Sequence, residues 1–246
     1  MKLVGVLCWF DESPSWLATA VAGFGRVCDH IVAVDGAYAL YPGARARSRP
    51  DQAEAVLIAA EAAGCGVTVH QPKDVFWGNE VEKRNLALGL AAPLDPDWVL
   101  VFDADMHVLQ VNAPEVRRDL EDTDANVATY TILDGVDLLA TEAAETAVSF
   151  PISSEWTLRT RLIYRWLPDL KYGPTHYSIS GLVDNGLVWL RGGETCEEPF
   201  HLEAGLVVNH RRAARTKVRQ DASQGYLDAR DRAGVEHVEN IDRLVI

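Results

Sequence analysis

The segment that most constrains the fold runs from Trp98 to Phe102 and continues directly into Asp103-Ala104-Asp105. Its uncharged residues predict a strand that is buried on both faces, as in the middle of a parallel sheet. Ligands bind at the carboxyl ends of such strands. Two carboxylates at that position, separated by one residue, suit a hard cation such as Mg²⁺ or Mn²⁺ that is shared with the phosphates of a substrate.

Strands and helices alternate along the chain before this segment. Apolar runs predict strands at 3–10, 31–34 and 67–69, and helices with one apolar face are predicted to begin near residues 14, 51 and 79. An acid follows three of the strands, namely Glu12, Asp35 and Asp103. We therefore expect an α/β fold with a Rossmann-like, mostly parallel central sheet, flanking helices and an acidic carboxyl edge.

The second half of the chain is less regular. Its predicted elements are a helix at 112–120, strands at 127–132, 161–166, 187–190 and 206–209, and a basic helix from 211 to about 232. Residues 37–50 are expected to form a polar loop, and 134–158 to form a variable, mobile segment because periodicity fails there. No stretch has the composition of a linker, so we expect a single domain over 1–246.

Composition restricts the partners and the compartment. The formal net charge of −13 and the pI near 4.9 argue against a surface that binds nucleic acid or an anionic membrane. The cysteines have no CxxC spacing and are expected to be reduced, partly buried thiols. The chain has neither a run of about 18 apolar residues nor the pattern of a secretory signal. We expect a cytoplasmic protein with no integral membrane segment.

The acidic edge suits a nucleotide-dependent transfer. Carboxylates at Glu12, Asp35 and Asp103 can accept hydrogen bonds from ribose hydroxyls and base imides. A divalent cation at Asp103 and Asp105 would supply a Lewis acid for a departing phosphate. For Glu12 and Asp35, a second interpretation as solvated turn or cap residues stays open.

The order of these motifs resembles that of glycosyltransferase family 2, whose members have the GT-A fold. The resemblance rests on Phe10-Asp11-Glu12, Ile31–Gly36, Lys83-Arg84-Asn85 and Trp98–Asp105, and it continues through Arg161–Arg165, Leu170–His176 and Val207–His210. Together these segments cover about residues 3 to 220. The order of the motifs along the chain is more specific than any one of them.

The resemblance implies a metal-dependent glycosyltransferase, of the hexosyltransferase type, that takes a sugar from a UDP- or GDP-sugar. It implies that Glu12 and Asp35 contact the nucleoside. It also implies that Arg84 helps to hold the nucleotide or its phosphates. Asp103 and Asp105 would engage the ribose, the diphosphate and Mn²⁺ or Mg²⁺.

The C-terminal half would complete this site. His210 follows a predicted strand and precedes a basic run, so we expect it to be the third metal ligand rather than a structural histidine. Arg211 and Lys217 in that run would contact the phosphates. Residues 1–110 would then be the nucleotide-binding half of the domain, and 111–246 the acceptor-side half that contains the basic helix.

The resemblance does not fix the catalytic base. Relatives often carry an acid directly after the Asp-x-Asp motif and another after the later histidine, where this chain has Met106 and Tyr177. His176, Glu155 and Asp184 are candidates by position, because inverting transfer needs a base within reach of the acceptor hydroxyl. Inverting and retaining mechanisms both stay open.

Two other functions compete with this prediction. A nucleotidyltransferase of related fold should begin with a glycine-rich, cation-bearing loop, but the loop Trp9–Pro14 has neither feature. A non-catalytic nucleotide- or sugar-binding protein with a degenerate transferase fold is disfavoured by Asp103, Asp105 and His210. The sequence does not identify the acceptor. A soluble glycan, small molecule or protein is expected rather than a lipid-linked acceptor.

Overall fold

The computed structural model describes residues 1–41, 45–134, 157–175, 177–192, 196, 198–210, 221, 224–226 and 228–229. The elements of the first half are β1 (Leu3–Cys8), α1 (Pro14–Phe24), β2 (His30–Val34), α2 (Pro50–Ala62), β3 (Gly66–His70), α3 (Glu80–Ala91), the 3₁₀ turn η1 (Ala92–Leu94) and β4 (Trp98–Phe102). Those of the second half are β5 (Met106–Val111), α4 (Ala113–Asp122), β6 (Val127–Asp134), β7 (Thr157–Arg165), β8 (Lys171–Tyr172), β9 (Ile179–Val183), β10 (Gly186–Arg191) and β11 (Phe200–His210).

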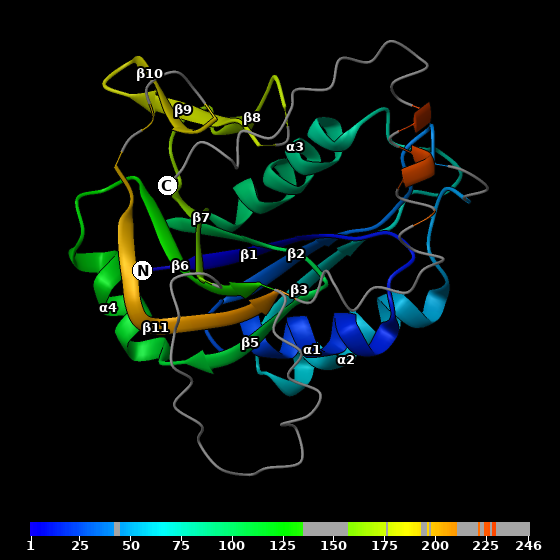
Figure 1. Ribbon diagram of the computed structural model, residues 1–246, viewed down its shortest axis with the longest axis horizontal. Helices are drawn as coiled ribbons and strands as arrows, with labels where there is room; N and C mark the ends of the chain where they lie inside the picture. Colours follow the sequence, from blue (N-terminus) through cyan, green and yellow to red (C-terminus); the bar gives the residue numbers. More distant parts are fainter. Residues whose placement is uncertain are drawn as a thin grey trace.

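The centre of the molecule is a curled, mostly parallel sheet (Figure 1). Over the described residues its strand order is β3-β2-β1-β4-β7-β6-β11-β5. β1 pairs with β2 and β4, and β2 pairs with β3, all in parallel. Every residue of β4 is buried, as expected for a central strand covered on both faces. The predicted α/β fold class with a Rossmann-like central sheet is therefore confirmed.

The second half of the chain extends this sheet with mixed pairing. β7 lies antiparallel between β4 and β6, whereas β11 is parallel to β6 and antiparallel to β5. The chain therefore leaves β4 at Asp103 and crosses to the far end of the sheet within a few residues. The sequence analysis missed β5, and it also missed the short strands β8 and β9. Their hydrophobic patterns are weak because β5 has exposed positions, β8 has only two residues, and Ser180 and Gly181 interrupt the apolar run of β9.

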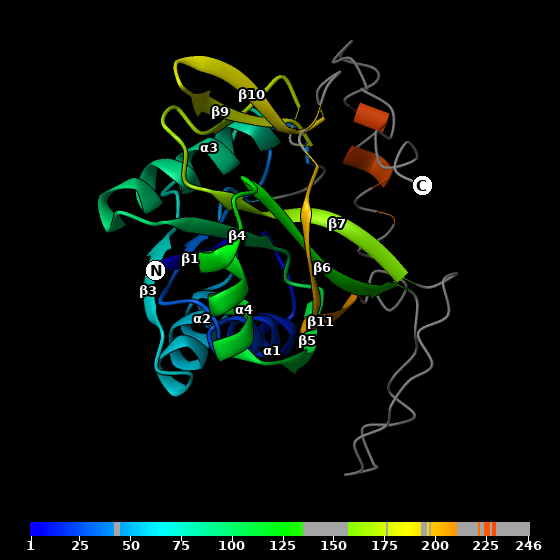
Figure 2. The same ribbon diagram turned by 90° about the vertical axis from the view of Figure 1, so that its left-hand side faces the viewer.

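Helices cover both faces of the sheet. α1 and α2 lie on one face, and α3 lies on the other beside the small antiparallel sheet of β8, β9 and β10 (Figures 1 and 2). In the core, Phe24 of α1 stacks on Phe102 of β4 with 4.2 Å between ring centroids. Such aromatic packing fixes α1 beneath the strand that carries the Asp-x-Asp motif. Among the described helices, none is both long and apolar enough to cross a bilayer.

The helix starts agree with the sequence analysis except at α2. Asn79 caps α3, since its side chain accepts a hydrogen bond of 2.9 Å from the backbone N–H of Glu82. α2 begins at Pro50 with Arg49 at the cap position, so Asp51, where the helix was predicted to begin, lies inside the first turn. The predicted polar loop and segment 134–158 fall partly outside the described residues, and the basic helix falls mostly outside them.

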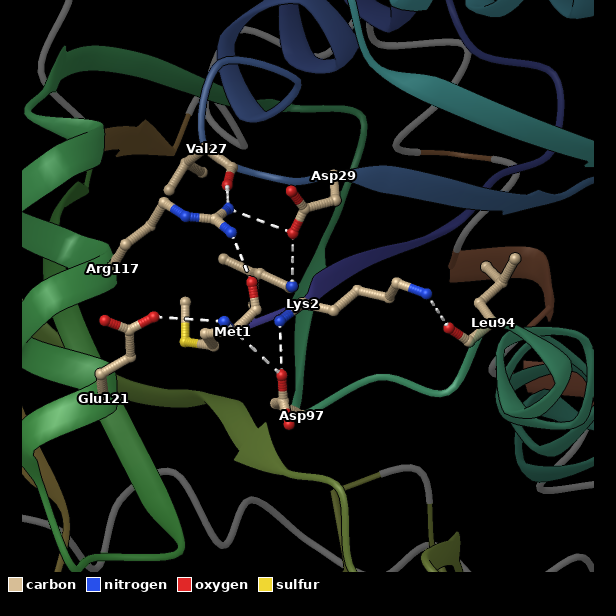
Figure 3. Close-up of polar contacts among 9 residues, drawn as sticks. Met1, Lys2, Val27, Asp29, Leu94, Asp97, Arg117 and Glu121 are labelled. Atoms are coloured by element: carbon tan, nitrogen blue, oxygen red, sulfur yellow. Dashed lines mark hydrogen bonds and ion pairs between the residues drawn. The ribbon is translucent and has the colours of Figure 1, made fainter.

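Opposite the acidic edge, polar contacts hold the beginnings of the strands together (Figure 3). Arg117 of α4 donates hydrogen bonds to the carbonyl oxygens of Met1 and Val27 and to the carboxylate of Asp29. Asp29 also accepts from the backbone N–H of Leu3 at 2.7 Å. One guanidinium therefore joins α4 to the starts of β1 and β2.

We expect Arg117→Ala to lower the free energy of unfolding by about 1–3 kcal/mol, because it removes the guanidinium that donates to the partly buried carbonyl oxygens of Met1 and Val27. Urea denaturation would measure the change. Arg118→Ala is the matched control, since Arg118 is exposed and contacts only its neighbour Asp119 among the described hydrogen bonds. An Arg117→Ala midpoint equal to that of the control would contradict this role.

Candidate functional site

Three parallel strands end side by side at one edge of the central sheet. Cys8 of β1 lies beside Val34 of β2, and Leu7 lies beside Phe102 of β4. The residues that follow these strands therefore gather at one edge, where α/β proteins bind ligands. Three of the predicted site residues follow these strands: Glu12, Asp35 and Asp103.

Asp105 and His210 meet although they are far apart in the sequence. The antiparallel pairing of β11 with β5 places His210 beside Met106, the residue after Asp105. The His210 Nε2 atom lies 3.5 Å from the Asp105 Oδ2 atom, and the Asp105 side chain is 1% exposed. The structure therefore brings two of the predicted metal ligands together.

Asp103 faces a cation from α3. The Nη2 atom of Arg84 lies 3.6 Å from the Oδ1 atom of Asp103, and the guanidinium lies over the ring of Tyr172. Burial opposes the charge of Arg84, but neighbours led by Asp103 raise the pKa of the guanidinium above its ordinary value. Asn85 exchanges two hydrogen bonds with the backbone of Tyr172, which fixes this part of α3 against β8.

Asp35 is fully buried and its carboxylate is already hydrogen-bonded. Its oxygens accept from the backbone N–H of Ser48 at 2.8 Å, from the Ser48 hydroxyl at 2.6 Å and from the Gln71 amide at 2.9 Å. Glu12 is buried as well. The alternative interpretation as a solvated turn or cap residue is therefore wrong for Asp35, which is 0% exposed, whereas Glu12 keeps 9% of its surface exposed. Their predicted contact with a nucleoside stays a prediction.

Polar residues that the sequence analysis missed organise this edge. Ser48 also accepts from the backbone N–H of Asp11 at 2.8 Å. The Gln52 amide oxygen accepts from the backbone N–H of Glu12 at 3.0 Å, and its amide nitrogen donates to Asp11. Gln52 lies on α2, so these bonds tie the loop after β1 to the start of that helix. Buried glutamine and serine side chains carry no periodic signal, and the sequence alone did not single them out.

Some side chains at this edge are of the types that bind a hard divalent cation. Asp103 and Asp105 provide carboxylate oxygens and His210 provides an imidazole, which are ligands that Mn²⁺ accepts. Over the described residues, no three His, Cys, Asp or Glu side chains are grouped closely enough to hold a metal ion. Magnesium sites commonly use one or two protein carboxylates and complete the shell with substrate phosphates and water. The predicted role of Asp103, Asp105 and His210 as metal ligands stays a prediction.

Among the three candidate catalytic bases, the structure describes only Asp184. Asp184 lies in the exposed turn between β9 and β10, in the small sheet. Four other predicted site residues lie outside the described residues: His176, Glu155, Arg211 and Lys217. The roles of these residues stay predictions.

Comparison with known proteins gives partial structural matches only. No protein-family model matches the chain, and no curated protein matches its sequence. The structure of S. aureus TarS 1-349 aligns with a TM-score of 0.43 at 14% identity, over 67% of this chain and 47% of that one. TarS 1-349 in complex with UDP-GlcNAc aligns with a TM-score of 0.41 at 15% identity, over 56% of this chain and 36% of that one.

A third match is a Bacillus anthracis protein described as a glucose-1-phosphate thymidylyltransferase, in complex with a sucrose. It aligns with a TM-score of 0.35 at 14% identity, over 55% of this chain and 56% of that chain. The aligned region spans less than half of the TarS chains and between 55% and 67% of this one.

Proposed function

We propose that the chain is a metal-dependent glycosyltransferase of the GT-A kind, which moves a hexose from a nucleoside-diphosphate donor to a soluble acceptor. The observation that carries the proposal is the meeting of Asp105 and His210 beside the strand end that holds Asp103. Chain segments from both halves converge there. Two carboxylates after β4, an imidazole from β11 and a guanidinium from α3 gathered at one sheet edge are typical of a functional site.

The part of the proposed site that would contact the nucleobase, here called the base-side part, is built around the ends of β1 and β2. Glu12 and Asp35 are held by buried hydrogen bonds, so this edge is organised before any ligand arrives. A preorganised pocket loses less entropy when it binds a nucleoside. Because Ser48 and Gln71 already donate hydrogen bonds to the Asp35 carboxylate, we assign Asp35 mainly to holding this edge in place.

The phosphate side is built around β4 and α3. Asp103, Asp105 and His210 would hold Mg²⁺ or Mn²⁺, which when bound supplies a Lewis acid for the leaving diphosphate. Arg84 stays charged and adjacent to Asp103, so it can orient a phosphate oxygen by hydrogen bonding. The burial of Asp105 strengthens every charge interaction at this point because the local dielectric is low.

A panel of nucleotide sugars tests the proposal. The purified protein should hydrolyse one UDP- or GDP-sugar slowly in the absence of acceptor, and the reaction should require Mg²⁺ or Mn²⁺. Release of pyrophosphate from a nucleoside triphosphate and a sugar 1-phosphate would instead identify a nucleotidyltransferase. Tight nucleotide binding with no turnover of any donor would identify a non-catalytic binding protein.

A further inference from the structure

Lys83 of α3 is a charged residue on a helix face that otherwise packs into the core. The buried residues of α3 are Lys83, Ala87, Leu88 and Ala91, which lie on one side of the helix. Lys83 is 1% exposed. Lysine is almost never fully buried unless its ammonium group is paired, so its contacts explain its position.

The ammonium of Lys83 binds two main-chain carbonyls at the ends of neighbouring strands. Its Nζ atom donates to the oxygen of Trp9 at 2.6 Å and to the oxygen of Gly36 at 2.8 Å. It also lies 5.5 Å from the ring centroid of Tyr38, where a cation–π interaction with the face of the ring stabilises the charge. Trp9 follows β1 and Gly36 follows β2, at the point where the chain leaves the parallel sheet.

The two carbonyls belong to the segments that carry the base-side residues. Glu12 lies three residues after Trp9, and Asp35 directly precedes Gly36. The Gly36 peptide is itself constrained, because Gly36 has a φ of +118° and a Cβ there would lie 2.6 Å from the indole nitrogen of Trp77. The last backbone hydrogen bond between these segments runs from the Trp9 N–H to the Val34 carbonyl at 3.0 Å, and the ammonium adds a second link just beyond it.

We propose that Lys83 is the positioning residue of the donor site, and that its ammonium holds the ends of β1 and β2 at the separation that a nucleoside requires. This inference rests on the proposed function. Lys83 acts through Glu12 and Asp35 and does not itself reach the reacting atoms, because it is enclosed below the edge.

The charge state of Lys83 gives the inference a pH dependence. Burial lowers the pKa of Lys83 from its ordinary 10.5 to about 8. Four other groups act on the ammonium, and they come from β1, from the end of β2 and from α3: Cys8, Asp35, Arg84 and Glu80. Burial raises the pKa values of the Cys8 thiol and the Tyr38 phenol. Lys83 is therefore the group in this cluster expected to lose its proton near pH 8.

Loss of that proton should have opposite effects on stability and on binding. Between pH 8 and 10.5 the unfolded chain binds a proton at this lysine that the folded chain has lost, so this contribution to stability rises with pH. Over the same range the two hydrogen bonds lose their charge assistance and weaken. The base-side pocket should then loosen, and donor affinity should fall as the contribution to stability rises.

The test compares Lys83→Met with Lys171→Met, a control at an exposed lysine on β8. Lys83→Met should raise the donor KM roughly tenfold with a smaller change in kcat, because the lost contacts are remote from the anomeric carbon. Amide hydrogen exchange at 9–12 and 35–38 should become faster in Lys83→Met. The Lys171→Met protein should match wild type in both measurements.

Wild-type protein provides a second test in case Lys83→Met does not fold. The affinity for UDP or GDP with Mg²⁺ is measured between about pH 7 and pH 9, and the lysine side chains are titrated by carbon-13 NMR. We expect affinity to fall with the same midpoint as one buried lysine. The inference is wrong if wild type binds nucleotide but its affinity does not change at the pH midpoint of the buried lysine. It is also wrong if Lys83→Met binds nucleotide as tightly as wild type and its amide exchange is unchanged. If wild type binds no nucleotide, the proposed function fails, while the exchange comparison still decides whether Lys83 holds the strand ends.

Discussion

Asp105→Asn is expected to reduce donor hydrolysis and sugar transfer by more than about a hundredfold while leaving the fold intact. A bound cation contributes several kcal/mol of charge stabilisation at a leaving phosphate, and a loss of that size corresponds to such a factor in rate. The change keeps the shape of the side chain, removes its charge and replaces one acceptor oxygen by an amide NH2 group. Because Asp105 is buried against His210, no water-exposed carboxylate can readily replace it.

Two measurements distinguish this outcome from simple destabilisation. Isothermal titration with Mn²⁺ and nucleoside diphosphate should show weakened cation binding, and the thermal midpoint should stay near that of wild type. Asp169→Asn is the matched control, because Asp169 is exposed and pairs with Lys171 away from the edge. Full activity in Asp105→Asn, or in wild type with excess chelator, would rule out the metal role.

His210→Ala should weaken the binding of the divalent cation in the presence of nucleotide by more than about tenfold, and activity should fall with it. Removing one ligand from a small set leaves the cation held by carboxylates and phosphates alone. His30→Ala serves as the control, because His30 lies at the opposite end of the strands and contacts Thr68.

The same variant tests the structural alternative for His210. In that alternative, the imidazole only stabilises the pairing of β11 with β5 beside the buried Asp105 carboxylate. His210→Ala would then lower the free energy of unfolding, but cation and nucleotide affinities would equal those of wild type. A buried carboxylate that loses its partner costs several kcal/mol. Stability and affinity must therefore both be measured on the same preparation.

The apolar pattern of the sequence was enough to predict the parallel half of the fold. β1, β2 and β4 are short apolar runs followed by acids, and this pattern is typical of strands that are buried on both faces of a sheet. The start of α3 near residue 79 was also predictable, because its cap is a local interaction between Asn79 and Glu82, three residues apart. β5 was missed because its outward-facing residues dilute the pattern.

By itself, the sequence determined the central strand, the position of Asp103 and Asp105 at its end, and the α/β class. These features depend on local propensity and on hydrophobic period. Only the tertiary structure placed His210 against Asp105, because that contact depends on the pairing of β11 with β5, and strand pairing over long separations has no local signal. The same holds for the bonds of Ser48 and Gln52 and for the burial of Lys83. The sequence gives the chemical type of a polar side chain, but its role depends on which distant groups it contacts after folding.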